Sequence, residues 1–317
     1  MKVLPQEEAL VLLGHWLDAS GYHFVTVTPA THARVNARPG VRPARSLRDV
    51  FGWSRPFEAG LLPEQAVQWL RDGGLLQEND GLLSSRVRFS SLGAQLYAHS
   101  RYPTDEADAV FFGPDSYRFS ALIEAELGRQ PLPLGARILD VGCGAGPGGM
   151  AAALASESGK PRLVLADINP QALVHARANA ALANLERVAF VQSDLYAQVE
   201  GEFDLIVANP PYLVDPSART YRNGGGPLGG GLSERIVAEG LPRLAPGGRL
   251  VLYTGAAIVE GGDPLLESLQ GLLRERGWAF SYRELDPDVF GEELELPAYG
   301  RADRIAAVAL VVQRPGS

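Results

Sequence analysis

Hydrophobic and polar positions follow two different patterns in the two parts of the chain. In the first part, apolar residues recur at helical spacing over 6–19 and 63–72, and Gly73-Gly74 is expected to end the second helix. The β-branched run 24–28 (FVTVT) predicts a strand. Two strand-like runs on either side of Asp80-Gly81 predict a β-hairpin, and 91–93 is expected to open another short helix.

This order of helix, hairpin and helix is similar to a winged-helix module. Such modules bind DNA in some proteins and serve as dimerisation or substrate-lid domains in enzymes. An acidic run (Asp105, Glu106, Asp108) follows Pro103 and predicts a domain junction. We therefore expect a smaller α+β domain over residues 1–104, which presents the substrate.

From residue 105 onward, short apolar strands alternate with helical stretches. This alternation predicts an α/β domain over 105–317 with a Rossmann-like, doubly wound sheet of seven strands. The last two strands have no helix between them, so they are expected to form an antiparallel hairpin at one edge of the parallel sheet. The predicted strands are 138–141, 163–166, 188–191, 205–208, 249–253, 278–285 and 304–312.

Composition excludes several classes of protein. A single cysteine, Cys143, excludes a disulfide framework and a Cys-rich zinc site, and the five histidines lack metal-ligand spacing, so we expect no metal. No stretch reaches 18 uncharged apolar residues, and residues 1–20 lack the apolar core of a signal peptide. We therefore expect a cytoplasmic protein without membrane contact. The sequence carries no signal for an oligomeric state.

The net charge of −8 is unevenly distributed. Residues 31–56 hold six arginines and only one acidic side chain, Asp49. One interpretation is a solvated, arginine-rich connector, and the other is a surface that contacts phosphates. The six arginines are Arg34, Arg38, Arg42, Arg45, Arg48 and Arg55.

Candidate chemistry follows the predicted strands at their carboxyl ends. The first strand runs into a glycine-rich turn, DVGCGAG at 140–146, where glycines allow a ligand to approach the backbone closely. Asp167 ends the next strand, at the distance where a carboxylate accepts hydrogen bonds from ribose hydroxyls. Ser193-Asp194 follows the third strand, where the carboxylate could reach an adenine amino group. The absence of a Gly-x-x-x-x-Gly-Lys loop makes a nucleotide triphosphatase a poor alternative.

These features, together with Asn209-Pro210-Pro211-Tyr212 (NPPY) after the fourth strand, resemble the class I S-adenosylmethionine-dependent methyltransferases over about residues 111–317. NPPY marks family members that methylate a planar nitrogen, either a base amino group or a glutamine amide. The likeness is greatest to the release-factor glutamine methyltransferases, which share the later glycine-rich stretch 224–237 and the LAPGGRLVL segment. The segment 111–119 differs from the Pro-Arg-x-Glu-Thr-like motif of those enzymes.

The resemblance implies that S-adenosylmethionine is the cofactor and that NPPY is the catalytic segment. Asn209, Pro210 and Tyr212 are the expected catalytic residues. The residues expected to hold the cofactor are Asp140, Gly142, Gly144, Gly146, Asp167, Ile168, Ser193, Asp194 and Asn209.

The chemistry of a planar nitrogen explains the tetrapeptide. The lone pair of an amide or aryl amine is delocalised, so the nitrogen is a poor nucleophile. Hydrogen bonds from its N–H groups to the Asn209 side-chain oxygen and the Pro210 carbonyl would orient it and favour a more tetrahedral nitrogen. Two prolines fix φ and hold the loop in shape, and Tyr212 would stack on the planar group.

Two other segments are candidates for substrate contact. Phe112, Asp115, Tyr117 and Arg118 precede the first strand of the sheet, where aromatic residues line a pocket or form core. The segment 221–231 after NPPY is either a loop that closes over the substrate or a solvated linker. His175, on the helix after Asp167, is expected to face solvent.

These predictions converge on an N-methyltransferase acting on a macromolecule. The arginine stretch favours RNA or DNA slightly over protein as the partner. The alternatives are a biosynthetic enzyme that uses S-adenosylmethionine on a small metabolite and a non-catalytic cofactor sensor. Asn209 argues against the sensor, because a sensor has no need to polarise an amine.

Overall fold

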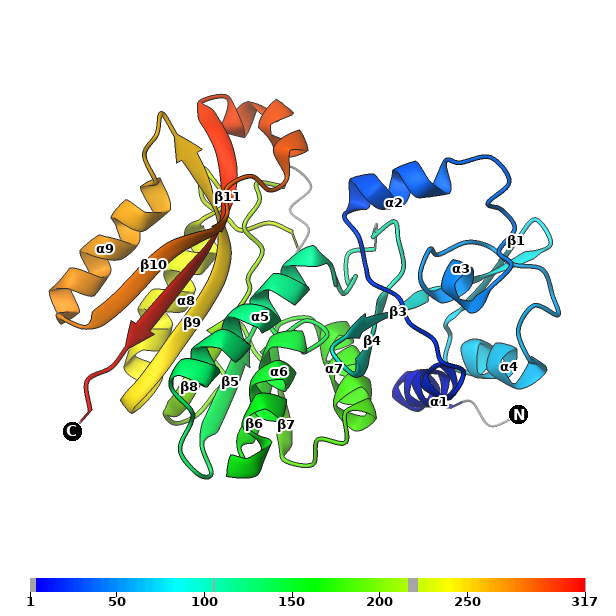
Figure 1. Ribbon diagram of the computed structural model, residues 1–317, viewed down its shortest axis with the longest axis horizontal. Coiled ribbons are helices and arrows are strands. Elements are labelled where there is room, and N and C mark those ends of the chain that lie inside the picture. Colours follow the sequence, from blue (N-terminus) through cyan, green and yellow to red (C-terminus); the bar gives the residue numbers. More distant parts are fainter. Residues whose placement is uncertain (1–3, 105, 216–221, 317) are drawn as a thin grey trace. The chain divides into compact units, whose positions relative to one another are not determined.

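The computed structural model describes residues 4–104, 106–215 and 222–316, and Figure 1 shows their helices and strands. The chain divides into two compact units. The first comprises Met1–Arg118, Gly144–Pro147 and Asn169–Glu186, and the second comprises Phe119–Cys143, Gly148–Ile168 and Arg187–Ser317. The two stretches 144–147 and 169–186 thus belong to the first unit, although in sequence each lies between segments of the second.

The second unit contains the seven-stranded sheet, in the order β10-β11-β9-β8-β5-β6-β7. Strands β5 to β9 pair in parallel, whereas β11 pairs antiparallel with both β9 and β10. The predicted fold class, including the antiparallel hairpin at one edge, is confirmed. The strands are β5 (Arg137–Val141), β6 (Arg162–Asp167), β7 (Val188–Gln192), β8 (Phe203–Ala208), β9 (Leu244–Val259), β10 (Ala279–Asp286) and β11 (Ala302–Gln313).

Successive side chains of each strand point to opposite faces of the sheet, and each face packs against different helices. Leu250 and Leu252 of β9 share one apolar cluster with helices α8 (Gly231–Gly240) and α9 (Pro264–Arg276). Tyr253 points to the opposite face, where its ring lies 6.3 Å from that of Phe119 in α5 (Pro114–Arg129). Figure 1 shows α5 and α6 (Pro147–Ala155) near the green strands β5 and β6.

Strand β9 is much longer than the five residues predicted for it. Its partner β11 pairs with it from Arg249 to Val259, so neighbouring backbone extends the strand beyond the apolar run that the sequence displays. Pairing across a sheet can override a weak local preference in this way.

The first unit contains helices α1 (Gln6–Ala19), α2 (Pro29–Asn36), α3 (Leu47–Phe51) and α4 (Glu64–Asp72), and α7 (Pro170–Leu182) packs with α1 and β4. Two antiparallel hairpins complete it. The predicted hairpin around Asp80-Gly81 is present as β1 (Leu76–Asn79) and β2 (Leu82–Ser85). The second hairpin pairs β3 (Val87–Leu92) with β4 (Gln95–Ser100).

Two local predictions for this unit are wrong. Residues 24–28 form no strand: Phe24 makes one backbone hydrogen bond to Ser91, but the amide of Thr26 donates to the Tyr117 hydroxyl at 2.9 Å instead of to a neighbouring strand. Residues 91–93 open no helix. Gly93 has a φ of 58° and forms the turn between β3 and β4, because the alternating residues on either side pair as strands.

His175 is a third correction, because its ring is buried and does not face solvent. It lies four residues before Asn179 on α7, and both residues belong to the buried side of that helix. Burial lowers the pKa of His175 to about 4, so the imidazole is neutral. The alanine-rich sequence of α7 conceals which face is buried, since small residues occur on all sides of the helix.

The boundary predicted at residues 104 and 105 stays a prediction, as does the likeness to a winged helix; Asp105 lies outside the described residues. Within the described residues, no helix is long and apolar enough to cross a membrane. The cytoplasmic location also stays a prediction.

Candidate active site

The order of the parallel strands creates a switch point between β5 and β8. From β5 the chain continues through β6 and β7 on one side, and then through β8 and β9 on the other. Ligands of open α/β sheets bind outside the carboxyl ends of the strands at such a point. Val141 pairs in register with Ala208, so Gly142 and Asn209, the next residues, leave the sheet at the same level on either side of it.

The glycine-rich loop follows β5. Gly142, Gly144 and Gly146 all have positive φ, at 67°, 54° and 86°, a backbone conformation that side chains disfavour. The amides of Gly142 and Cys143 donate to the carbonyl of Ala166 at the end of β6, at 2.8 and 3.0 Å. These bonds fix the start of the loop against the sheet. Cys143 is buried, and burial raises the pKa of its thiol, which fits a small packing residue.

Asp140 holds the helix that follows the loop. Its buried carboxyl accepts a hydrogen bond from the amide of Gly149, in the first turn of α6, at 2.7 Å. Burial raises the pKa of Asp140 to about 7, although this hydrogen bond opposes the shift. This bond ties the end of β5 to the first turn of α6 across the loop, and contact of Asp140 with a cofactor stays a prediction.

Asp167 and Ile168 stand at the carboxyl end of β6. Asp167 is largely buried and its backbone carbonyl accepts from the amide of Ser193 at 2.9 Å, which joins the ends of β6 and β7. The side chain of Ile168 is 51% exposed, one of three large apolar side chains so exposed among the described residues. This pair suits a molecule that carries a sugar next to a flat ring: the carboxylate accepts hydrogen bonds from a sugar hydroxyl, and the exposed apolar side chain covers the ring.

Ser193 and Asp194 have unlike environments. The Ser193 hydroxyl is buried; it donates to the carbonyl of Leu195 at 2.9 Å and accepts from the amide of Gln198 at 3.0 Å. It therefore shapes the turn after β7. The Asp194 carboxylate is exposed and lies 3.7 Å from Arg235 of α8. Both lie at the carboxyl edge of the sheet, as predicted.

Asn209 and Pro210 leave β8 at this same edge. Asn209 is half-buried, and its side-chain amide makes no hydrogen bond within the described part of the chain. Pro210 is buried and restricts the backbone that follows Asn209. An amide oxygen on a restrained backbone, at a switch point, is suited to accept an N–H from a bound ligand.

Tyr212 is packed tightly at the end of the tetrapeptide. Its ring is only 6% exposed, and it lies edge-on to Phe290, with ring centroids 5.8 Å apart. The ring also lies directly over Gly255 of β9, where an added Cβ would come within 2.1 Å of Tyr212 Cδ2. Only glycine fits at position 255 while the ring stays there.

The glycine-rich segment after NPPY packs against the tetrapeptide, so the solvated-linker alternative is wrong for its described residues. The amide of Gly224 donates to the carbonyl of Leu213 at 2.9 Å, and a Cβ at Gly229 would lie 2.2 Å from the carbonyl oxygen of Tyr212. Arg222 forms ion pairs with Asp215 and Glu293. Tyr221, which begins the predicted loop, lies outside the described residues.

The four predicted substrate residues belong to the first unit. Phe112 is buried and stacks on Tyr97 and His99, so it is part of the core. Asp115 is buried and forms an ion pair with Arg118 at 3.3 Å. The Tyr117 hydroxyl accepts the amide of Thr26. Contact of these residues with a substrate stays a prediction.

Asn179 is a residue that the sequence analysis missed. Its buried side chain accepts from the amide of Ala98 in β4 at 2.7 Å and donates to the Ala98 carbonyl at 3.0 Å. It also donates to the carbonyl of Ala145, between two glycines of the loop, at 2.9 Å. One amide thus joins the glycine-rich loop to the second hairpin. No sequence spacing indicated this, because the partners are backbone groups.

Comparison with known proteins gives a family match for the centre of the chain. Residues 120–258 match the family model described as the methyltransferase small domain. Release factor glutamine methyltransferase of Deinococcus radiodurans is 34% identical over 204 residues, which cover 60% of this chain and 66% of that protein. Ribosomal RNA small subunit methyltransferase C of Salmonella newport is 40% identical over 109 residues, 32% of this chain and 31% of that protein.

Among solved structures, Trm5b from Pyrococcus abyssi has a TM-score of 0.50 at 15% identity, covering 80% of this chain and 71% of that chain, a likeness of fold alone. The chain spans just under two thirds of the first relative's length and about a third of the second's. These comparisons confirm the predicted likeness to methyltransferases. The arginine stretch at 31–56 lies outside the family match.

Proposed function

We propose, from the match of residues 120–258 to the methyltransferase small domain, that this chain is an S-adenosylmethionine-dependent N-methyltransferase acting on a planar amino or amide nitrogen of a macromolecule. The observation that carries the proposal is the position of Asn209. It follows β8 at the switch point of the sheet, one residue beyond the pair that Ala208 forms with Val141.

The residues at the carboxyl edge fit the cofactor. S-adenosylmethionine, when bound, supplies a methyl group activated on a sulfonium centre. The left-handed glycines 142, 144 and 146 leave the loop backbone open to a close ligand. Asp167 would accept hydrogen bonds from ribose hydroxyls, and the exposed Ile168 would cover one face of the adenine. Asp140 and Ser193 would act indirectly, by holding α6 and the turn after β7.

Asn209 and Pro210 would prepare the nitrogen of the substrate. The Asn209 side-chain oxygen and the Pro210 carbonyl accept its two N–H groups, which orients the nitrogen and draws its lone pair out of conjugation. Placement of two acceptors on a rigid backbone avoids reorganisation during the reaction. The Tyr212 ring packs against Phe290 and Gly255 and is only 6% exposed, so its contribution here would be to hold the loop after Pro210 in shape.

Two substitutions test this division of roles. Asn209→Ala removes one acceptor and is expected to lower the rate of methyl transfer by about 10²–10³-fold, with the Kd for the cofactor changed less than about threefold. Asp167→Ala is expected to weaken cofactor binding first. Calorimetric titration with S-adenosylmethionine and single-turnover methyl transfer measure the two effects. Equal loss of binding and rate in Asn209→Ala would contradict the catalytic role.

A further inference from the structure

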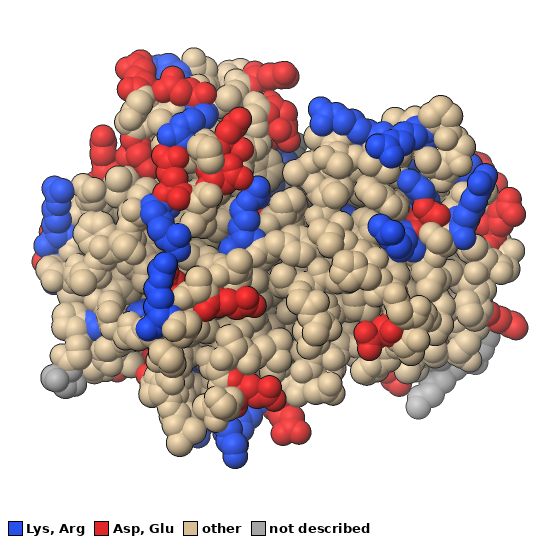
Figure 2. Space-filling model, viewed as in Figure 1, with Lys and Arg blue, Asp and Glu red and all other residues tan. Residues whose placement is uncertain are grey.

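Five of the six arginines in residues 31–56 are exposed on the first unit. Arg34 lies in the last turn of helix α2, three more arginines follow it, and Arg48 lies in α3. Figure 2 shows basic side chains gathered in the upper right, where Figure 1 places α2 and α3. We call this set the arginine surface; it comprises Arg34, Arg38, Arg42, Arg45 and Arg48.

The acidic side chain nearest to these arginines in sequence, that of Asp49, already has other partners. Asp49 forms an ion pair with the buried Arg55 and accepts hydrogen bonds from the amide of Arg45 and the hydroxyl of Ser46. Within the described part of the chain, none of the arginines of the arginine surface has an ion pair. Five guanidinium groups without carboxylates leave a local excess of positive charge on a chain whose net charge is −8.

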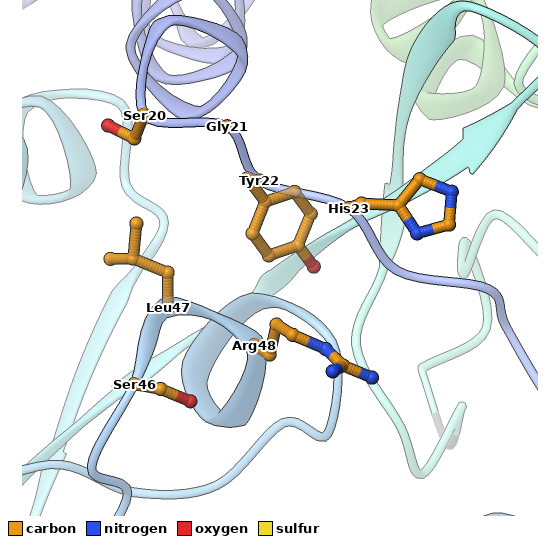
Figure 3. A pocket seen from close by; sticks show the side chains of 7 residues that line it. All are labelled: Ser20, Gly21, Tyr22, His23, Ser46, Leu47 and Arg48. Carbon is orange, nitrogen blue, oxygen red and sulfur yellow. The ribbon is translucent and has the colours of Figure 1, made fainter.

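A hollow of about 450 Å³ opens beside Arg48. Figure 3 shows Tyr22 on one side and Ser46, Leu47 and Arg48 together on the other, with the imidazole of His23 directed away from Tyr22. The Tyr22 hydroxyl donates to the carbonyl of Phe89 at 2.8 Å, which fixes the ring. Ser20, Ser46 and Arg48 are the other polar side chains that line this open hollow.

We propose that the arginine surface binds the phosphate backbone of a nucleic acid, and that the hollow beside Arg48 receives one nucleotide unit. Arginine presents a planar fork of donors that matches phosphate oxygens, and it stays charged at every physiological pH. Five such groups along one strand would each replace a condensed counterion. This inference names the substrate class of the proposed function. The part that nucleic-acid binding plays in catalysis therefore rests on the proposed function.

The character of the surface favours nucleic acid over an acidic protein. Protein interfaces bury a core of apolar and aromatic side chains. Among the described residues, the large apolar side chains that are exposed are Val25, Leu134 and Ile168, and only Val25, two residues after His23, belongs to the first unit. A surface with five exposed arginines and one such apolar side chain is closer to the composition that phosphate contacts use, because such contacts position a backbone without reading sequence.

Binding of the full chain to a fluorescent single-stranded oligoribonucleotide, without cofactor, tests the proposal. Fluorescence anisotropy at several salt concentrations should show affinity falling by about 10²-fold between 50 and 200 mM salt. The triple variant Arg38→Gln, Arg42→Gln, Arg45→Gln should reduce the slope of log affinity against log salt by about 2, since each contact with a single strand contributes about 0.7.

A matched control removes the same charge elsewhere. Arg162, Arg187 and Arg274 are exposed on the second unit, and their triple replacement by Gln should leave the salt slope unchanged. Equal loss in the two triple variants, or no affinity for RNA or DNA at 50 mM salt, would overturn the proposal. Arms with single-stranded DNA and with polyglutamate identify the ligand, and preference for polyglutamate would also overturn it.

Arg48→Gln tests the hollow by itself. It should weaken binding of a single nucleoside monophosphate by at least fivefold, whereas Arg34→Gln should not. Because none of these binding assays requires methyl transfer, a chain that binds RNA but transfers no methyl would refute the proposed function alone. A chain that methylates without binding nucleic acid would refute this inference alone.

Discussion

The carboxyl edge of the sheet and the arginine surface are built in opposite ways. At the sheet edge, backbone geometry places each group: left-handed glycines, strand register and a ring seated on Gly255 leave little freedom. At the arginine surface, long exposed side chains extend from α2, α3 and the loop between them. The first arrangement suits chemistry, which needs fixed geometry, and the second suits adaptable contact with a charged polymer.

This difference predicts separable effects on turnover and on binding. Changes at the sheet edge should lower kcat, since they disturb groups that act in the transition state. Changes at the arginine surface should raise KM, since they remove contacts made equally before and during the reaction.

After Asn209→Ala, the largest effect in this comparison is expected from Gly255→Ala. The added methyl would collide with the Tyr212 ring and displace it, and a displacement of about 1 Å can cost about 10²-fold in rate. Gly271→Ala is the control, because Gly271 lies in α9 with open space around it. Steady-state kinetics measure both variants, and wild-type kcat in Gly255→Ala would contradict the role of the packed ring.

A smaller effect is expected from the arginine triple variant at 150 mM salt. Loss of three phosphate contacts should raise KM for a nucleic-acid substrate by roughly 30-fold, with kcat at saturation unchanged. Initial rates over a range of substrate concentrations give both constants. A fall in kcat with constant KM would mean that the arginines act in the chemistry, and the contrast between the two regions would fail.

Asn179→Leu probes a connection between the glycine-rich loop and the hairpin of the first unit. Two backbone carbonyls and one amide lose their partner in the interior, so we expect about 3 kcal/mol lower free energy of unfolding. Cofactor affinity should fall several-fold, because the carbonyl of Ala145 is released. Denaturant unfolding and calorimetric titration measure the two quantities, and unchanged stability would show that these bonds contribute little.

A further effect, on stability alone, is a pH dependence that arises from Asp140. Its pKa of about 7 in the folded protein exceeds the ordinary value of an aspartate, so between these two pKa values the folded state retains a proton that the unfolded state has lost. The stability that this proton contributes is complete below about pH 4 and is lost as the pH rises through about 7. Across that range the free energy of unfolding should fall by at most about 1.4 kcal/mol for each pH unit. Asp140→Asn should remove this dependence, and an identical pH profile in both proteins would contradict the raised pKa.

The sequence predicted the sheet well, because seven apolar runs between helices leave little choice of architecture. It also placed Gly142, Asp167, Ser193 and Asn209 at one edge, since each follows a parallel strand. The errors have physical causes. Thr26 bonds to the distant Tyr117, and the alanines of α7 hid the burial of His175.

Other features of the site depend on contacts between distant segments, which composition and spacing do not encode. The packing of the Tyr212 ring on Gly255 and the three hydrogen bonds of the Asn179 side chain are of this kind. The arginine surface shows the converse case. Its residues were obvious in the sequence, but only the structure separates Arg55, buried with Asp49, from the five exposed arginines.

The most direct test of the central claim is transfer of a labelled methyl group from S-adenosylmethionine to separate RNA, DNA, protein and metabolite fractions. The chain and its Asn209→Ala variant would be compared at equal cofactor occupancy. We expect label on nitrogen in a nucleic-acid fraction with the wild-type chain and almost none with the variant. Label only in the metabolite fraction, or equal label from both proteins, would contradict the account.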